Sequence, residues 1–248
     1  MCPLVDARNY RKTDHNEIFI SEMAFRLDRG FVMRMGLFGP IHKGIRHILN
    51  TRVLQLGQLD LRVVADVKSQ SDEIRRSFEV LHVHAAAEEE FVFPHVEEKN
   101  RDLFDRLIRD HQTFTPIMDL FEQQMKALTV DEERTTKGTD IAQTFNDFVA
   151  KYSAHMLVEE KMAMPILWDV LEDNQIVGII GKMSMKPAPD VFQYFLQYLV
   201  QATNPMERMG ILSGMKSFMP AARFQGAIQT AQKALSSKEW EALRQAIE

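Results

Sequence analysis

Apolar residues recur at spacings of three and four over long stretches of the chain, and this is the period of an amphipathic helix. Glycine and proline are sparse, at 11 and 9 of 248 residues, and they gather at a few places. No segment shows a convincing alternation of apolar and polar residues of the kind found in strands. The pattern therefore predicts an all-α chain whose helices end at Gly, Pro or polar turns.

The same pattern divides the chain into three parts. Residues 1–39 contain one amphipathic helical segment, over about 14–29. Residues 40–175 are expected to form four long helices in sequence, and residues 176–248 a helical extension.

The boundaries of the long helices follow from their Gly, Pro and polar residues. The first should run from Pro40, which suits a first turn, to Gly57 as its stop, and the second should begin near Ser71. The expected turns are the stretches 58–69, 97–102 and 130–140. Each later helix meets a proline that should disturb or kink it: Pro94, Pro116 and Pro165.

After Gly181 the pattern changes to short helices, each with its own start signal. These signals are Asp190 after Pro-Ala-Pro, Asn204-Pro205, Pro220, and Ser236 with Glu239 as a capping box. The extension is expected to cover the end of the long helices or to form a homodimer.

One motif occurs twice. Residues 84–94 read HAAAEEEFVFP and residues 155–165 read HMLVEEKMAMP, so both copies contain His, three residues, Glu-Glu, four residues and Pro. The spacing from His to Glu is weak by itself, because with 35 acidic residues in 248 roughly one His in seven has an acid four positions on. The second acid and the proline, present in both copies, make coincidence a poor explanation.

Four residues of the motif lie inside the apolar stripes of their helices: His84, Glu88, His155 and Glu159. An unpaired carboxylate in a core costs several kcal/mol, so these groups need strong compensation, which a divalent or trivalent cation supplies. His42 and His111 interrupt the stripes of the other two long helices. All four helices thus offer inward ligands for a cation.

The positions of these residues agree with one level in an antiparallel arrangement. Ligands at one level place each turn about midway between consecutive ligands. The midpoints are 63, 98–99 and 133, and all three fall in expected turns.

With these residues the chain resembles the hemerythrin-like, or HHE cation-binding, domains over about residues 40–170. The resemblance is carried by His42 in IHKGIRHIL, the two HxxxE pairs, and His111 in RDHQTF. It implies an up-down four-helix bundle that holds a non-haem di-iron centre.

The resemblance also implies a role for each ligand. His42 and His84 would bind one iron and His111 and His155 the other, with Glu88 and Glu159 bridging the two, and a solvent-derived oxo or hydroxo bridge would complete five ligands per iron. The open position is where a small molecule binds. Manganese stays an alternative to iron for such a site.

The chain departs from oxygen-carrying hemerythrins at Thr115, where they have another histidine. This disfavours a dedicated oxygen carrier and favours a sensor, an iron-handling centre or a redox-active centre. The function expected is a protein that binds or senses oxygen, nitric oxide or peroxide, or that handles iron. The alternative is a di-iron oxidase or peroxidase, so the question of enzymatic activity stays open. A metal-free adaptor leaves the inward His and Glu unexplained, and a ferritin-like site needs two Glu-x-x-His motifs where only EVLH at 79–82 is present.

Other polar residues are interpreted more simply. The histidines outside the ligand set are expected at the surface or, beside the motif, in contact with a ligand: His15, His47, His82 and His95. Glu89, Glu90 and Glu160 are expected to be solvated, although Glu89 or Glu160 could orient a ligand. Tyr152 is interpreted as a packing residue rather than a radical site.

Composition excludes several other classes. The net charge is −5 with no basic stripe, which argues against nucleic acid as a partner, and the single cysteine, Cys2, excludes an intrachain disulfide. No apolar run reaches the ~18 to 20 residues of a membrane span, and the N-terminus lacks the apolar stretch of a signal peptide. A cytoplasmic location is therefore expected.

Overall fold

The computed structural model describes residues 34–130 and 134–247, and every regular element in these ranges is a helix. This confirms the all-α prediction for the described part of the chain. The helix expected over 14–29 lies outside the described residues. All of the helices below belong to one compact unit, Gly36–Glu248.

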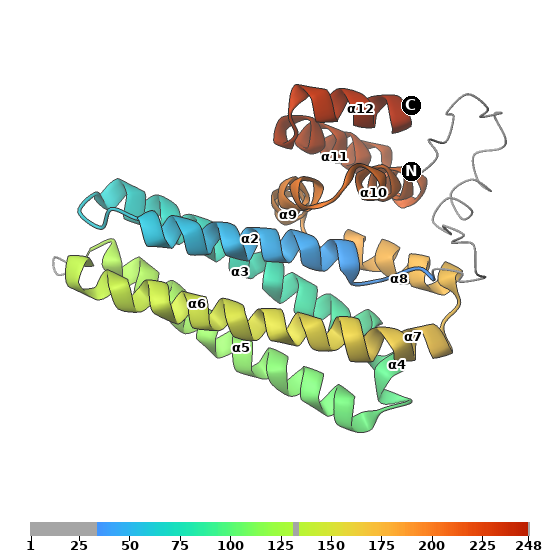
Figure 1. Cartoon of the computed structure of the whole chain (residues 1–248), viewed down its shortest axis with the longest axis horizontal. Coiled ribbons are helices and arrows are strands. Elements are labelled where there is room, and N and C mark those ends of the chain that lie inside the picture. Colours follow the sequence, from blue (N-terminus) through green and yellow to red (C-terminus); the bar gives the residue numbers. More distant parts are fainter. Residues whose placement is uncertain (1–33, 131–133, 248) are drawn as a thin grey trace, which may run out of the picture. The chain divides into compact units, whose positions relative to one another are not determined.

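Four long helices lie side by side, and consecutive ones run in opposite directions (Figure 1). They are α2 (Gly39–Gln58), α3 (Val64–Phe91), α5 (Arg101–Leu128) and α6 (Arg134–Val158). Helix α2 begins with Pro40 in its first turn, and Asn100 caps α5 by accepting from the backbone N–H of Leu103. The first turns are thus organised by the residue types that favour helix starts.

Aromatic side chains fill much of the interior between these helices, on the side that faces the C-terminal ends of α2 and α5. Phe78, Phe121, Phe145 and Phe148 are buried, and their ring centroids lie 5.2 to 6.1 Å apart. Such pairs add specific edge-to-face or tilted contacts to the burial of apolar area. The aromatic core therefore joins α3, α5 and α6, and apolar residues of α2 such as Ile45 and Leu49 pack into the same cluster.

Both copies of the repeated motif end in a break of the helix. After α3 the chain turns at Val92 into the short α4 (Phe93–Glu97), and after α6 it forms a π-helix, η1 (Glu159–Ala163), that leads into α7 (Met164–Val170). Pro94 and Pro165 each lie six residues after the motif's first glutamate, and proline has no N–H to continue the α-helical ladder. In η1 the N–H of Met164 instead bonds the carbonyl of Glu159, five residues back.

Two helix starts differ from the sequence prediction, and one of them is that of α6, which begins at Arg134 inside the expected turn 130–140. Helix α3 begins at Val64 rather than near Ser71, so the connection after α2 shrinks to residues 59–63. Val67 is fully buried and joins the core, which explains why two further turns are helical. Pro116 lies at an exposed position inside α5, and the helix continues past it to Leu128.

The rest of the chain forms α8 (Asp173–Met185), α9 (Pro189–Ala202), α10 (Pro205–Phe218), α11 (Ala221–Ala234) and α12 (Ser237–Ile247). Asn204 and Glu207 form a capping box at α10, and Ser236 exchanges bonds with Glu239 at α12, as the start signals predict. Gly181 lies inside α8, so the change to short helices comes earlier than the sequence pattern indicates.

Helix α9 packs along α2, and the helices after it share a separate apolar core. The two helices lie close together at Gly44, where an added Cβ would lie 2.8 Å from Cε2 of Phe195 and 3.2 Å from the Cα of Leu199. Gly44 comes two residues after His42. The extension therefore holds α2 at the level of its predicted ligand, and a homodimer through these helices stays a prediction.

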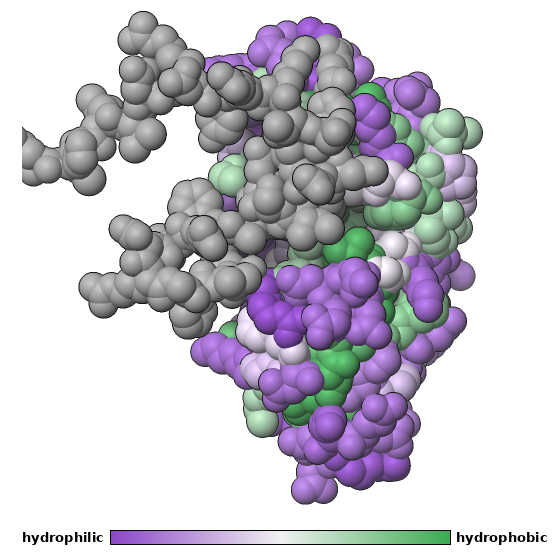
Figure 2. Space-filling view, turned by 90° about the vertical axis from the view of Figure 1, so that its right-hand side faces the viewer, coloured by the Kyte–Doolittle hydropathy of each residue, from purple (hydrophilic) through white to green (hydrophobic). Residues whose placement is uncertain are grey.

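Among the described residues, no helix combines the length and the apolar character that crossing a membrane requires. Figure 2 shows one face of the molecule, where hydrophilic residues surround smaller apolar areas.

Candidate metal centre

The six predicted ligands come together in one buried cluster. His42 lies in the first turn of α2, His84 and Glu88 lie near the end of α3, and His111 lies in α5. His155 and Glu159 lie on either side of the boundary between α6 and η1. Exposed fractions run from 0% for both glutamates to 8% for His84, so water does not compensate these charges.

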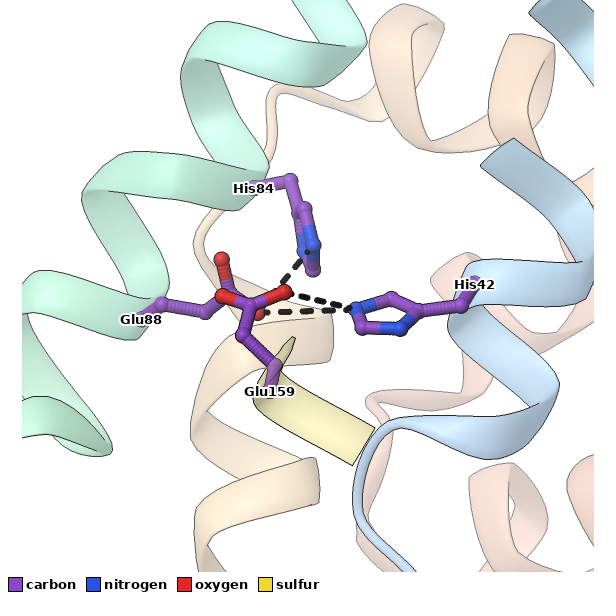
Figure 3. A group of neighbouring side chains, drawn as sticks. All are labelled: His42, His84, Glu88 and Glu159. Carbon is purple, nitrogen blue, oxygen red and sulfur yellow. Dashed lines mark ion pairs between the residues drawn. The ribbon is translucent and has the colours of Figure 1, made fainter. Parts of the chain in front are cut away.

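One half of the cluster contains His42, His84, Glu88 and Glu159 (Figure 3). Nε2 of His84 lies 3.1 Å from Oε1 of Glu88, and Nε2 of His42 lies 3.4 Å from Oε2 of Glu159. One ligand atom from each of the four residues fits within 4.8 Å of the others. These atoms surround a common point.

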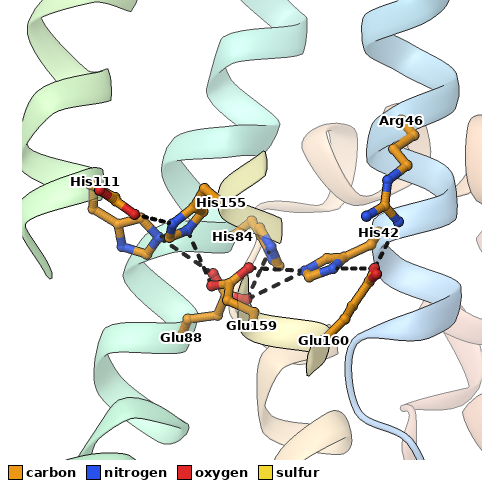
Figure 4. A network of polar contacts seen from close by, with 9 residues as sticks. His42, Arg46, His84, Glu88, His111, His155, Glu159 and Glu160 are labelled. Atoms are coloured by element: carbon orange, nitrogen blue, oxygen red, sulfur yellow. Dashed lines mark hydrogen bonds and ion pairs between the residues drawn. The ribbon is translucent and has the colours of Figure 1, made fainter. Parts of the chain in front are cut away.

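The other half contains His111 and His155 with the remaining carboxylate oxygens (Figure 4). The Nε2 atoms of the two histidines lie 2.9 Å apart, and Nε2 of His155 lies 3.2 Å from Oε1 of Glu159. Oε2 of Glu88 lies 3.7 Å from Nε2 of His111. Glu88 and Glu159 thus each direct one oxygen towards each half, which is the arrangement that a bridging carboxylate needs.

The unsatisfied hydrogen-bonding atoms of the cluster test whether a cation fits. Among the described residues, the buried atoms without a hydrogen-bond partner include Nε2 of His42 and His84 and all four oxygens of Glu88 and Glu159. They lie close together yet are not aligned for hydrogen bonds. Ligands in adjacent octahedral positions at ~2.1 Å from an ion lie about 3 Å apart, and these atoms show similar separations. The donor set therefore fits metal ions held between these side chains.

The pKa values of the buried histidines and glutamates also indicate that the cluster lacks a compensating positive charge. Burial opposes protonation of His42, but the hydrogen bond to Glu160 and the charges of Glu88 and Glu159 outweigh it and raise the pKa of His42 to about 9. Burial raises the pKa of Glu88 to about 8, and the charge of Glu159 adds to this shift. Burial also lowers the pKa of His84 well below its usual value. Without a cation, the cluster must hold protons at neutral pH.

Three further carboxylates bind the outer nitrogens of the histidines. Oε1 of Glu160 accepts from Nδ1 of His42 at 2.9 Å and from Nη1 of Arg46 at 2.7 Å. Oε1 of Glu89 lies 2.9 Å from Nδ1 of His111, and Oδ2 of Asp110 lies 3.2 Å from Nδ1 of His155. A proton held at Nδ1 leaves Nε2 unprotonated and directed at the metal.

Sequence reasoning anticipated part of this outer set. Glu89 and Glu160 follow the two predicted bridging residues, and the option that they orient a ligand agrees with their contacts. The sequence does not predict the role of Asp110, although Asp110 precedes His111, because its partner His155 lies on another helix. The sequence does not predict the contact of Arg46 with Glu160 either, because charged residues are common on helices.

The remaining polar residues near the motif lie outside the cluster. Glu90 is exposed and pairs with Lys186. The hydroxyl of Thr115 donates to the backbone carbonyl of His111, so it is occupied by its own helix. Nε2 of His47 lies 3.3 Å from the amide oxygen of Gln201. His82 and His95 are half-buried and belong to neither metal group, and His15 lies outside the described residues.

Comparison with known proteins gives one family. Neither the curated proteins nor the solved structures include a significant match to the chain. The family model of the hemerythrin HHE cation binding domain matches residues 39–167, more than half of the chain and the whole of the cluster. The chain therefore belongs to the hemerythrin HHE cation-binding domain family.

Proposed function

We propose that the protein is a non-haem di-iron protein of the hemerythrin type that binds or senses a small ligand such as oxygen, nitric oxide or peroxide, or that handles iron. In this proposal α2, α3, α5 and α6 form the up-down four-helix bundle of the family. The observation that carries it is that the six buried residues form two candidate metal groups, in which all four oxygens of Glu88 and Glu159 and Nε2 of His42 and His84 have no hydrogen-bond partner.

Each ligand has a role that follows from its direction. His42 and His84 would hold one iron, His111 and His155 the other, and Glu88 and Glu159 would bridge them. Two histidines and two carboxylate oxygens would hold each iron, and a solvent-derived oxo or hydroxo group would complete five ligands, so that a small molecule could still bind. When bound, the iron pair supplies redox chemistry and an exchangeable position for a small molecule.

The three carboxylates outside the ligand set orient the imidazole rings of the histidines. Glu89, Asp110 and Glu160 hold three imidazoles with Nε2 directed inward and add negative charge just outside the ligands. Negative charge at this distance favours the more highly charged oxidation state of the metal. Manganese, which accepts the same donors, is the alternative that metal analysis distinguishes.

A substrate-oxidising enzyme would need space for an organic substrate beside the ligands. One pocket of about 300 Å³ lies at the other end of the long helices, among Leu56, Leu61, Met125, Leu128 and Ile141, and none of the six ligands lines it. This pocket therefore supplies no substrate space at the centre. Ligand binding or sensing is proposed first because the ligand set is complete, and the oxidase or peroxidase is the alternative.

The test is metal analysis combined with absorption spectra of the anaerobically reduced protein before and after oxygen or nitric oxide. We expect about two iron ions per chain and a spectral change on adding the gas. Glu88→Ala and Glu159→Ala should lose most of the iron, whereas Glu79→Ala, an exposed glutamate on α3, should keep it. Protein that takes up no metal, or iron-loaded protein whose spectrum ignores both gases, contradicts the proposal.

A further inference from the structure

Tyr152 lies on α6, one turn before His155, and it is almost completely buried, at 1% exposure. Its ring packs among Phe114, Phe148 and His155, with centroid distances of 5.0, 5.7 and 5.9 Å. The ring thus closes the aromatic core directly beneath the His111 and His155 half of the cluster. Packing accounts for the ring but not for the hydroxyl.

The hydroxyl of Tyr152 has no hydrogen-bond partner among the described residues. Buried tyrosine hydroxyls normally find one, because an unpaired polar group in a core costs free energy. Elsewhere the chain follows this rule: the buried hydroxyl of Tyr194 lies 3.0 Å from Oγ of Ser77 and donates to Glu73. Tyr152 is therefore an exception that needs an explanation.

Other buried atoms near Tyr152 also lack a hydrogen-bond partner. They are Nε2 of His42 and His84 and the four oxygens of Glu88 and Glu159, and in the proposed function these atoms bind metal ions. The ring of Tyr152 packs against one of the candidate ligands, His155. A tyrosine phenol is ordinarily neutral at neutral pH, and a neutral phenol can donate one hydrogen bond.

Comparison of the two motif copies shows that the hydroxyl is not required for packing. The position three residues before the histidine is Tyr152 in the second copy and Leu81 in the first, and Leu81 is also fully buried. A purely apolar side chain therefore fills the corresponding position in α3. The phenol exists on only one side of the centre, that of His111 and His155.

We propose that Tyr152 is a positioning residue whose hydroxyl donates a hydrogen bond to the small ligand bound at the His111 and His155 side of the centre. This inference rests on the proposed function. Oxygen-derived ligands, nitric oxide and azide all carry acceptor atoms, so the hydroxyl selects ligands that accept a hydrogen bond over those that do not. The donor stays on the protein, and no electron or proton needs to be transferred.

The test is an azide titration of the iron-loaded, oxidised protein, followed by absorption. Tyr152→Phe keeps the ring and removes only the hydroxyl, so iron content should match that of the unaltered protein while the Kd for azide rises about tenfold. Tyr194→Phe is the matched control, since it removes a buried phenol hydroxyl away from the centre, and it should leave the azide Kd unchanged. In the metal-free protein Tyr152→Phe should fold at least as stably, because it removes an unpaired group.

A spectroscopic measurement on the unaltered protein needs no variant. If Tyr152 donates to azide, the azide vibration in the resonance Raman spectrum should shift between H₂O and D₂O, and Tyr152→Phe should abolish that shift. No shift in the unaltered protein, or an unchanged azide Kd in the variant, overturns the inference. A variant that loses iron while its remaining sites bind azide normally overturns it too, because the hydroxyl would then act on the ligand carboxylates. Failure of the unaltered protein to take up iron or azide is a separate result that contradicts the proposed function itself.

Discussion

At the scale of single residues, the centre is built from pairs: each motif copy supplies a predicted bridging glutamate followed directly by a second glutamate that binds a histidine from outside. Glu88 and Glu159 face inward, whereas Glu89 and Glu160 contact Nδ1 of His111 and His42. In both copies the second glutamate thus orients a histidine of another helix. The adjacent Glu-Glu of the motif therefore makes two different kinds of contact, because successive residues of a helix point in different directions; in α3 the rotation is about 100° per residue.

The outer carboxylates should tune metal affinity without being ligands. Glu89→Gln and Glu160→Gln should each weaken iron binding by about 10- to 100-fold, as loss of such partners typically does, because the histidine loses its charged orienting group. Competition with a chelator measures the change. Glu90→Gln is the control, since Glu90 is adjacent in sequence but pairs with Lys186, and an equal loss of iron in that variant would contradict the role assigned to the other two.

The raised pKa values of His42 and His155 predict how the stability of the metal-free protein and its metal binding depend on pH. Burial opposes protonation of His42 and His155, but their carboxylate neighbours raise the pKa of each from 6.5 to about 9. A raised histidine pKa stabilises the folded state fully below 6.5, and this contribution is lost as pH rises through about 9. The metal-free protein should therefore lose stability between pH 6.5 and 9, and metal should bind more tightly and release protons over the same range.

Thermal or urea unfolding of metal-free protein at several pH values measures the first effect, and calorimetry of metal binding in buffers with different ionisation heats measures the second. Iron-loaded protein is the reference, since metal replaces the protons and should remove the loss of stability. Metal uptake without proton release near pH 7.5 would show that the histidines are already deprotonated.

At the scale of elements, the contact between α2 and α9 depends on the absence of a side chain at Gly44. A Cβ there would meet both Phe195 and the backbone of Leu199, and backbone cannot move aside cheaply. Gly44→Val should lower the free energy of unfolding by about 1 to 3 kcal/mol, as overpacking typically does. Chemical denaturation measures the change.

Gly57 is the matched control because it is also in α2 and an added Cβ there meets nothing within 4 Å. Gly57→Ala should be neutral or should stabilise by up to about 1 kcal/mol through helix propensity. If Gly44→Val were as well tolerated, the close approach of the two helices would not hold in solution.

At the scale of the whole molecule, a buried arginine joins the long helices to the extension. Arg52 on α2 is 1% exposed, and its Nη2 lies 2.8 Å from Oε2 of Glu73 on α3 and 3.3 Å from the hydroxyl of Tyr194 on α9, with a further hydrogen bond to Tyr198. Three helices therefore meet at one guanidinium. Its five donors suit such a junction better than an ammonium group would.

Removing this guanidinium should lower the stability of the protein without changing how much metal it binds. Arg52→Met should lower the free energy of unfolding by about 2 to 4 kcal/mol, somewhat less than for a fully buried pair, since Glu73 is partly exposed. Iron content should not change. Arg75→Met, which breaks an exposed pair with Glu79, should cost at most about 1 kcal/mol, and a similar loss in both variants would show that Arg52 is no junction.

The sequence alone determined the features that depend on local periodicity and local chemistry. The 3.6-residue period and the caps at Asn204 and Ser236 gave an all-helical chain with many of its boundaries, and polar residues inside apolar stripes identified the six residues that the structure gathers. These signals are local because helical hydrogen bonds and caps join residues only a few positions apart.

Only the tertiary structure decided what lies across from each residue. The contact of Asp110 with His155, the close approach at Gly44 and the junction at Arg52 each join residues from different helices, and no spacing along the chain encodes them. The early start of α3 has the same cause, since the burial of Val67 against other helices outweighs the polar sequence around it. The unpaired hydroxyl of Tyr152 likewise became visible only once every neighbour in the core was in place.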